Sequence, residues 1–428
     1  MHLRKTVLLV GGLALLQATL ACPALADDTS VAATAVNALG VDLLACVAKP
    51  NENALLSPYS IQSALAMTYA GAAGETKAEM AKVLHYPDDE AALHRSFAAF
   101  RKKLEEIHGR TTREVKDSAN EGGPSEPVTL EIANRLYGQS GYAFRPAFLS
   151  LVKDNYGAPF QPVDFLHAAE SACREINRWV SERTHERINN LMPYGGLDRK
   201  TRLVLVNAIY FKAAWMEEFP GSSTNKEPFF VGGTQVEKVQ TMQHESHRFG
   251  YMRGDGFCAL TIRYVGSDVQ LLVLLPDKID GLAALETQLS PKLLAKCADS
   301  DPAFLILHLP KFKLEPPMIL LGSVLQSLGL RKAFDLPNGS ADFDQMAPRK
   351  PNDYLALSEV FHKTFLALDE QGTEAAAATS VVTLASFGIE TGPRPNPIEV
   401  RVDHPFLFAI QHRASGACLF LGRVVDPR

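Results

Sequence analysis

The chain has 428 residues, of which 46% are hydrophobic and 21% are charged, a composition typical of an ordinary globular protein. Its 43 Lys and Arg residues against 48 Asp and Glu give a formal net charge of −5, which excludes a basic footprint for nucleic acid. The 26 prolines and 29 glycines are spread along the chain, so collagen-like and low-complexity architectures are excluded as well.

Residues 1–26 have the pattern of a secretory signal peptide. Two basic residues precede an apolar stretch, and small residues at 24–26 offer a cleavage site. The stretch is too short for a membrane span, so we expect no transmembrane segment. A second processing route stays open, because residues 19–22 resemble a bacterial lipobox that would make Cys22 a lipidated N-terminus.

The predicted elements change in kind along the chain. Helical apolar spacing predicts helices over residues 31–48, 60–84 (broken at 71–74), 90–108, 171–190 and 319–329. Residues 111–127 are expected to form an exposed loop, and strands are expected over residues 128–137, 202–211, 257–264, 269–275, 304–309 and 405–410. Helices concentrate early and strands late, without regular βαβ alternation, which predicts an α+β fold. No repeat or linker divides the chain, so residues 27–428 are predicted to form a single domain.

The cysteine pattern and the catalytic motifs are both negative signals. Once the leader is removed, five widely spaced cysteines remain without a C-x-x-C pair, which favours buried free thiols over a zinc site, with one disulfide as the open alternative. No nucleophile elbow, phosphate-binding loop or dinucleotide fingerprint occurs. His185 and His244 are each followed by Glu but lack the second histidine of a zinc-protease motif. We therefore predict no catalytic residues, no metal and no cofactor.

The informative segment follows residue 369. Four alanines after Glu374 would favour a helix, but residues 380–386 are small and β-branched, which favours a strand. Gly372 can act as a hinge, because glycine tolerates backbone angles that other residues avoid. The alternate positions on one face carry no charge: Thr373, Ala375, Ala377, Thr379, Val381, Thr383 and Ala385. Such a segment could enter the middle of a sheet with its uncharged side inward.

This pattern, together with motifs elsewhere, resembles the serpin family of protease inhibitors. The other matching motifs are residues 53–61, 64–72, 132–137, 163–165, 205–212 with Trp215, 309–312, 341–343 and 403–408. The resemblance extends over essentially the whole chain after the leader. It implies the serpin fold, about nine helices around three β-sheets, with an exposed reactive-centre loop at about residues 370–400.

The resemblance also assigns roles to individual residues. The hinge of the loop would be Glu370, Gly372, Thr373, Glu374, Ala375, Ala376, Ala377, Ala378 and Thr379. The seventeenth residue counted from Glu370 is Ser386, so the protease would cut between Ser386 and Phe387. The shutter and breach, through which the loop enters the sheet, would be Ser57, Ser60, Asn207, His362 and Trp215. Without the family match, the two serines would be interpreted as helix caps, and His362 and Trp215 as core residues.

One departure from the family pattern leaves the bond open to another placement. The stretch from Phe387 to Pro405 is longer than the usual spacing, and counting backwards would place the bond nearer Arg394. Ser386 is preferred because the sheet fixes the length that inserts, whereas the downstream connection can vary.

The function that the resemblance implies is suicide-substrate inhibition of serine endopeptidases, followed by insertion of the cleaved loop into the central sheet. Residues 384–387 indicate elastase-, subtilisin- or chymotrypsin-like targets, with a papain-like cysteine protease as a further partner. The alternative within the family is a non-inhibitory serpin that acts as a binding or chaperone protein, although no Pro or charge interrupts the inward positions. We expect a monomer that is secreted or held in a bacterial periplasm or cell envelope, with anchoring through Cys22 as the alternative.

Overall fold

The structure is a computed structural model, and it describes residues 29–119, 123–124, 126–351, 353–374 and 396–428. Nine α-helices lie in these residues. They are α1 (Ser30–Val47), α2 (Pro58–Ala70), α3 (Gly74–Val83), α4 (Glu90–Ser118), α5 (Pro146–Tyr156), α6 (Phe165–Arg183), α7 (Leu282–Gln288), α8 (Pro291–Ala298) and α9 (Leu321–Ser327).

The strands of the described residues form three sheets. A nine-stranded sheet has the order β1-β17-β16-β8-β7-β6-β9-β15, with β5 paired to β6. Its strands are β1 (Ala54–Leu56), β5 (Asn225–Val231), β6 (Gln235–Arg253), β7 (Phe257–Arg263), β8 (Val269–Pro276), β9 (Pro302–Pro310), β15 (Ile398–Arg401), β16 (Phe406–His412) and β17 (Ala417–Val424). A six-stranded sheet has the order β10-β13-β14-β4-β2-β3. Its strands are β2 (Thr129–Gln139), β3 (Phe160–Val163), β4 (Leu203–Ala214), β10 (Phe312–Leu314), β13 (Leu366–Leu368) and β14 (Gly372–Thr373). The third sheet pairs β11 (Ile319–Leu320) with β12 (Phe361–His362).

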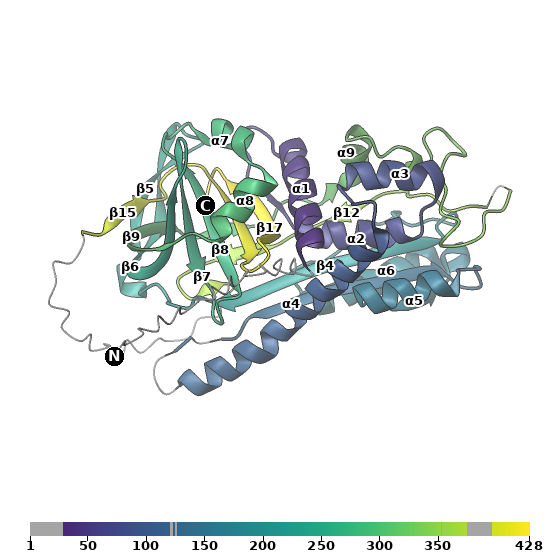
Figure 1. Cartoon of the computed structure of the whole chain (residues 1–428), viewed down its shortest axis with the longest axis horizontal. Coiled ribbons are helices and arrows are strands. Elements are labelled where there is room, and N and C mark those ends of the chain that lie inside the picture. Colours follow the sequence, from purple (N-terminus) through teal and green to yellow (C-terminus); the bar gives the residue numbers. More distant parts are fainter. Residues whose placement is uncertain (1–28, 120–122, 125, 352, 375–395) are drawn as a thin grey trace, which may run out of the picture.

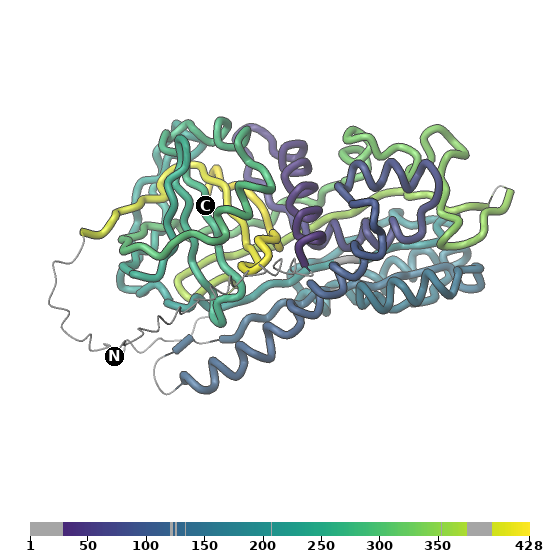
Figure 2. The backbone as a smooth tube through the Cα atoms, viewed as in Figure 1, coloured from purple at the N-terminus to yellow at the C-terminus, as the bar shows by residue number. Residues whose placement is uncertain are grey.

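The molecule is elongated, and β4 of the six-stranded sheet is a long strand that reaches from the part holding the nine-stranded sheet into the other part (Figure 1). The strand-rich part gathers β6, β7 and β8, whereas α2, α3, α5, α6 and α9 lie in the other part (Figure 1). In the strand-rich part, strands from the C-terminal residues lie among strands from the middle of the chain (Figure 2).

The core of the strand-rich part consists of strands that are buried along their whole length. Every residue of β8, β16 and β17 is buried, as expected for a sheet covered on both faces. Helices α1 and α2 contact β17, and α2 also contacts β4. Helix α1 is long and apolar enough to cross a membrane by length and composition, but its buried residues pack within this fold as a core helix.

Helix α4 is longer than the sequence pattern predicted. The prediction of a loop from residue 111 is wrong up to Ser118, where the helix ends. Thr111 is fully buried, and its hydroxyl accepts a hydrogen bond from the backbone N–H of Val128, so this turn packs against the start of β2. A tertiary contact thus stabilises a stretch that is polar in sequence.

Other element boundaries were shifted or missed. Helix α6 begins at Phe165 and ends at Arg183 rather than spanning 171–190, and residues 319–320 form a strand before α9. Strands β5 and β6 were not predicted, because their exposed positions carry charged and polar residues that obscure the apolar alternation. The other predicted helices and strands lie within a few residues of their expected positions. The single domain over residues 27–428 stays a prediction.

Candidate functional site: a slot in the six-stranded sheet

Next to β4, the six-stranded sheet has a strand position that the described residues fill only at one end. One edge of β4 pairs with β2 over most of its length, from Leu203 to Lys212. The other edge pairs with β14, which contributes only Gly372 and Thr373. From Leu203 to Lys212, that second edge of β4 has no strand partner among the described residues. We call the space between this edge of β4 and β13 the slot.

The hinge residues occupy the upper end of the slot. Gly372 pairs with Ala214 and Thr373 with Ala213, both antiparallel, and Thr373 also pairs with Leu368 of β13. A Cβ atom on Gly372 would lie 1.9 Å from the carbonyl oxygen of Ala213, so only glycine permits this close approach of the two backbones. The glycine that the sequence marked as a hinge is therefore also the residue that lets the hinge enter the sheet.

Thr373 is the first side chain of the segment to enter the interior. It is completely buried, and its hydroxyl lies 2.6 Å from the hydroxyl of Tyr264. Trp215, at the end of β4, stacks on the Tyr264 ring with centroids 4.5 Å apart. The indole N–H of Trp215 donates to the carbonyl of Asp369 at 2.9 Å, and its backbone N–H donates to the carbonyl of Gln371 at 2.8 Å. Trp215, predicted as the breach residue, thus holds the turn that precedes β14.

Ionic contacts hold the start of the hinge. The Glu370 carboxylate accepts from Lys311 Nζ at 2.7 Å and from the Thr224 hydroxyl at 2.8 Å. Burial acts to raise the pKa of Glu370, but the hydrogen bonds from Lys311 and Thr224 outweigh it, and the pKa lies below its ordinary value. The carboxylate therefore stays charged and tied to the end of β9 and to the segment before β5.

Glu374 is the last described residue of the hinge. Its φ of +54° is in the left-handed region, so the chain turns out of the strand direction at this residue. Its backbone N–H donates to the carbonyl of Ala367 at 2.8 Å, and its side chain, only 7% exposed, pairs with Arg187. Burial raises the pKa of the Glu374 carboxyl, and the hydrogen bond and charge of Arg187 oppose that rise.

The lower end of the slot opens into a cavity of about 630 Å³. Residues from α2, from the first four positions of β4 and from the segment 354–362 line it. This cavity lies where a strand between β4 and β13 would continue.

The predicted shutter residues lie beside this cavity. The backbone N–H of Ser57 donates to His362 Nε2 at 3.1 Å, and the Ser57 hydroxyl donates to the carbonyl of Leu419 at 2.7 Å. The backbone N–H of Ser60 donates to the Ser57 oxygen at 3.3 Å, so Ser57 also caps α2. Burial lowers the pKa of His362 to about 4, which keeps the imidazole neutral and able to accept this bond. The backbone of Asn207 pairs with Asn134 on β2.

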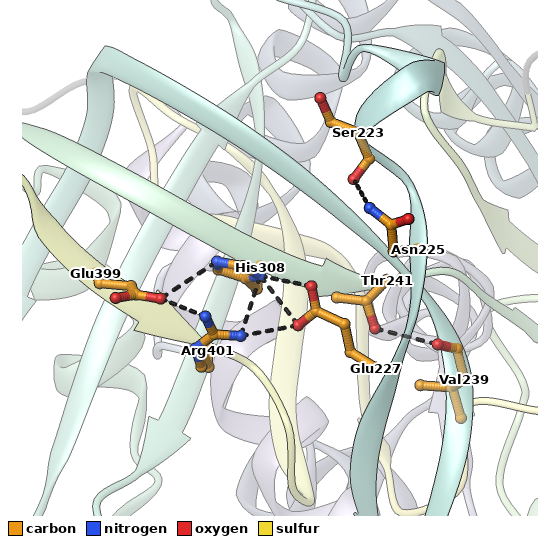
Figure 3. Close-up of polar contacts among 8 residues, drawn as sticks. All are labelled: Ser223, Asn225, Glu227, Val239, Thr241, His308, Glu399 and Arg401. Carbon is orange, nitrogen blue, oxygen red and sulfur yellow. Dashed lines mark hydrogen bonds and ion pairs between the residues drawn. The ribbon is translucent and has the colours of Figure 1, made fainter.

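The other end of the loop is held differently. Strand β15 pairs parallel with β9, and its residues form a polar cluster with His308 (Figure 3). Nδ1 of His308 lies 2.9 Å from the Glu227 carboxylate, and Arg401 contacts both Glu227 at 3.0 Å and Glu399 at 2.5 Å. We call Glu227, His308, Glu399 and Arg401 the clasp.

Part of the predicted site lies outside the described residues. This applies to the hinge alanines 375–378, to Thr379, and to the bond between Ser386 and Phe387.

Among the residues that the structure describes, no group of three or more His, Cys, Asp or Glu could hold a metal ion. Five cysteines there are unpaired: Cys46, Cys173, Cys258, Cys297 and Cys418.

Sequence reasoning missed three partners of the hinge: Tyr264, Lys311 and Arg187. Lys311 was within a matched motif, but its contact with Glu370 spans 59 residues of chain. Tyr264 and Arg187 are separated from the hinge by more than 100 residues, and no local pattern marks either of them.

Comparison with known proteins identifies this architecture. Residues 34–427 match the family model described as "Serpin (serine protease inhibitor)". The chain belongs to the serpin family. It is 38% identical over 387 residues to leukocyte elastase inhibitor A of Mus musculus, covering 88% of this serpin and 94% of that protein.

Solved serpin structures match in two states. The native state of the thermophilic serpin tengpin superposes with a TM-score of 0.76 and 28% identity, over 92% of this chain and 93% of that one. A cleaved serpin, Serpin 42Da, gives the same TM-score and identity over 94% of this chain and 100% of that one. The fold is therefore that of a serpin, and the slot is the feature of this chain that bears most directly on its function.

Proposed function

We propose that this serpin inhibits serine endopeptidases by suicide-substrate trapping, with insertion of the cleaved loop into the slot. The observation that carries the proposal is β14, which occupies the first two positions of a strand whose remaining positions are not filled by any described residue.

The register of β14 predicts how the rest of the loop would fit. In the antiparallel pairing, the numbers of each pair add to the same sum: Gly372 with Ala214 and Thr373 with Ala213. Continued in this register, Thr379 would lie opposite Asn207, and residue 383 opposite Leu203, the first residue of β4. Directly opposed residues point to the same face, and Ala213, Phe211 and Ile209 all belong to the main hydrophobic core. The loop face that meets the core would therefore be its uncharged face, from Thr373 to Thr383.

The chemistry needs no catalytic group from the serpin itself. The serine hydroxyl of the protease attacks the carbonyl carbon of Ser386, and the bond to the nitrogen of Phe387 breaks. The serine proton passes through the catalytic base of the protease to the new amine of Phe387, and an ester joins the two proteins. Water would release an ordinary product by hydrolysis, but insertion carries the ester away and distorts the protease before that step.

The energy of insertion is large enough for this work. About ten new strand residues at roughly 1 kcal/mol of net hydrogen-bond stabilisation each give about 10 kcal/mol. That is comparable with the whole stability of an ordinary domain. The uncleaved state can therefore be metastable with respect to the inserted one.

We propose elastase-, subtilisin- or chymotrypsin-like targets, with a papain-like cysteine protease as a second class. The support is the small and apolar sequence before residue 387 and the name of the mouse relative, an elastase inhibitor. We further propose that the chain acts as a monomer and is secreted or held in a bacterial envelope, cut after residue 26 or lipidated at Cys22. The only support for this location is the sequence of residues 1–26. The elastase inhibitor relative, which is from mouse, gives no support for a bacterial envelope.

The test is to incubate the protein with one protease of each class and to analyse the products on denaturing gels and by mass. We expect a complex that resists boiling in detergent and a released fragment of residues 387–428. Thr373→Arg places a charge at a fully buried position and should give cleavage without complex. Val236→Arg adds the same charge at an exposed position and should leave the complex intact. Cleavage without any complex from all proteases would favour the non-inhibitory alternative, a binding or chaperone protein.

A further inference from the structure

The hinge meets an arginine on a segment that crosses the slot. Residues 184–202, which we call the strap, connect α6 to β4. On one side, buried strap residues such as Ile188 and Leu191 pack in a cluster with Val206 and Ala208 of β4. On the other side, Lys363, just before β13, donates to the carbonyl of Asn189 at 3.0 Å. The strap therefore contacts both walls of the slot.

Arg187 lies on the strap at the point where the seated hinge ends. Its guanidinium pairs with the Glu374 carboxylate and lies 5.2 Å from the ring centre of Phe365, on the β13 side of the slot. Half of the Arg187 side chain is exposed, whereas the Glu374 side chain is only 7% exposed. The pair thus satisfies a carboxylate that the fold has removed from water, and the hydrogen bond to Glu374 raises the pKa of Arg187.

The register gives this pair a direction. Thr373 points into the core, so the next residue of a strand points to the opposite face, where the strap lies. If the register continued, Glu374 would stand opposite Lys212. Burial raises the pKa of the Glu374 carboxyl, and the charges of Arg187, His185 and Lys212 oppose that rise. The first outward side chain of an inserting strand would therefore carry a negative charge into a positive environment.

We propose that Arg187 is a positioning residue of the inhibitory reaction. It holds Glu374 at the mouth of the slot, keeps the hinge seated at Thr373, and so lets insertion start from a seated strand once the loop is cut. The turn at Glu374, with its left-handed φ, is the state that Arg187 stabilises before cleavage.

The role of Arg187 can be measured from the fraction of cleaved serpin molecules that trap a protease instead of being released by hydrolysis. Insertion competes with hydrolysis of the ester, so a slower start of insertion releases more protease. Without Arg187, the Glu374 carboxylate would be buried without its ion-pair partner, and the hinge would leave the slot more often. The number of serpin molecules consumed per protease trapped should then rise about fivefold, a discount from the full effect because Arg187 is half exposed.

This inference rests on the proposed inhibitory function, and the experiment separates the two. The stoichiometry of inhibition is measured for the wild type, Arg187→Ala, Arg187→Lys and the matched control Arg183→Ala, whose arginine contacts Glu131 at 3.9 Å instead of the hinge. We expect a rise for Arg187→Ala, a smaller rise for Arg187→Lys, and the wild-type value for Arg183→Ala. If the wild type traps no protease, the proposed function fails. If it traps protease and Arg187→Ala has the same stoichiometry, only the role of Arg187 fails.

A double-mutant cycle distinguishes positioning from a purely structural effect. In a Glu374→Gln background, Arg187 has no carboxylate to hold, so Arg187→Ala should cause little further change in stoichiometry. An equal rise in both backgrounds would show that Arg187 acts through the fold of the strap, and would overturn the proposal. Because the comparison is made within each background, it remains decisive even if Arg187→Ala lowers the stability of the strap.

Discussion

The two ends of the reactive-centre loop are anchored by opposite means. At the N-terminal end, β14 pairs with strands on both sides, and Thr373 is fully buried. We call this position of Gly372 and Thr373 the seat, and the stacked rings of Trp215 and Tyr264 lie beside it. At the C-terminal end, β15 is the last strand of its sheet and pairs with β9 alone among the described strands. Its clasp is ionic, and the side chains of Glu399 and Arg401 are about half exposed.

The difference fits two different tasks. Because β14 is paired on both sides at one end of the slot, further loop residues could extend it as a strand. Exposed ionic pairs contribute little in water, so the backbone pairing of β15 with β9 is its main attachment. The loop is therefore joined to the body by β14, which further residues could extend, and by β15, which keeps the C-terminal end attached.

The largest expected effect comes from adding one methyl group to the seat. Gly372→Ala would place a Cβ atom 1.9 Å from the carbonyl oxygen of Ala213, so β14 could not pair as it does. We expect the yield of detergent-resistant complex to fall at least about tenfold while cleavage continues, since a backbone clash of this kind costs more than 1.4 kcal/mol. Gly109→Ala is the matched control, because nothing lies within 4 Å of its added methyl group. An unchanged yield would mean that the seat is not needed for insertion.

A second effect, on the stability of the fold rather than on the yield of complex, is expected from titration of His362. Its pKa of about 4 in the folded protein lies below the ordinary value of 6.5, so only the unfolded chain takes up this proton between those two values. Stability from this group is complete above pH 6.5 and falls by about 3 kcal/mol as the pH decreases to 4.

The measurement is the urea midpoint of unfolding between pH 4 and pH 7. In His362→Gln, the amide oxygen can still accept from Ser57, but the side chain does not titrate. We expect a flatter pH profile for this variant than for the wild type. Identical slopes would show that His362 is not the neutral acceptor that the geometry indicates.

The smallest effect is expected at the clasp. Arg401→Ala removes contacts to both Glu227 and Glu399, and exposed pairs of this kind are each worth about 0.5 kcal/mol. The amides of β15 should then exchange hydrogen about three- to fivefold faster, whereas those of β13 should not change. Arg428→Ala, which removes an exposed pair with Asp426, is the control and should leave β15 unaffected. Equal protection in both variants would mean that backbone pairing alone holds β15.

Sequence reasoning was most successful where a function imposes a local pattern. The run from Thr373 to Thr383 keeps every second position uncharged, which predicts entry into a sheet, and Thr373, its first residue, pairs with β4. Strands β8 and β16 were also predicted, because strands buried along their whole length are continuous apolar runs in the sequence. Strands β5 and β6 were missed, because polar and charged residues at their exposed positions obscure the apolar alternation.

The sequence by itself determined the α+β class, the family resemblance and the composition of the hinge, because each depends on residue types at short spacing. Only the tertiary structure decided that Gly372 and Thr373 pair with β4, and which carboxylate meets Arg187 and which meets Lys311. These are contacts between segments separated by 59 to 187 residues, and no local pattern encodes such a distance. They arise because closing the fold brings the strap, β9 and the hinge to the same end of one sheet.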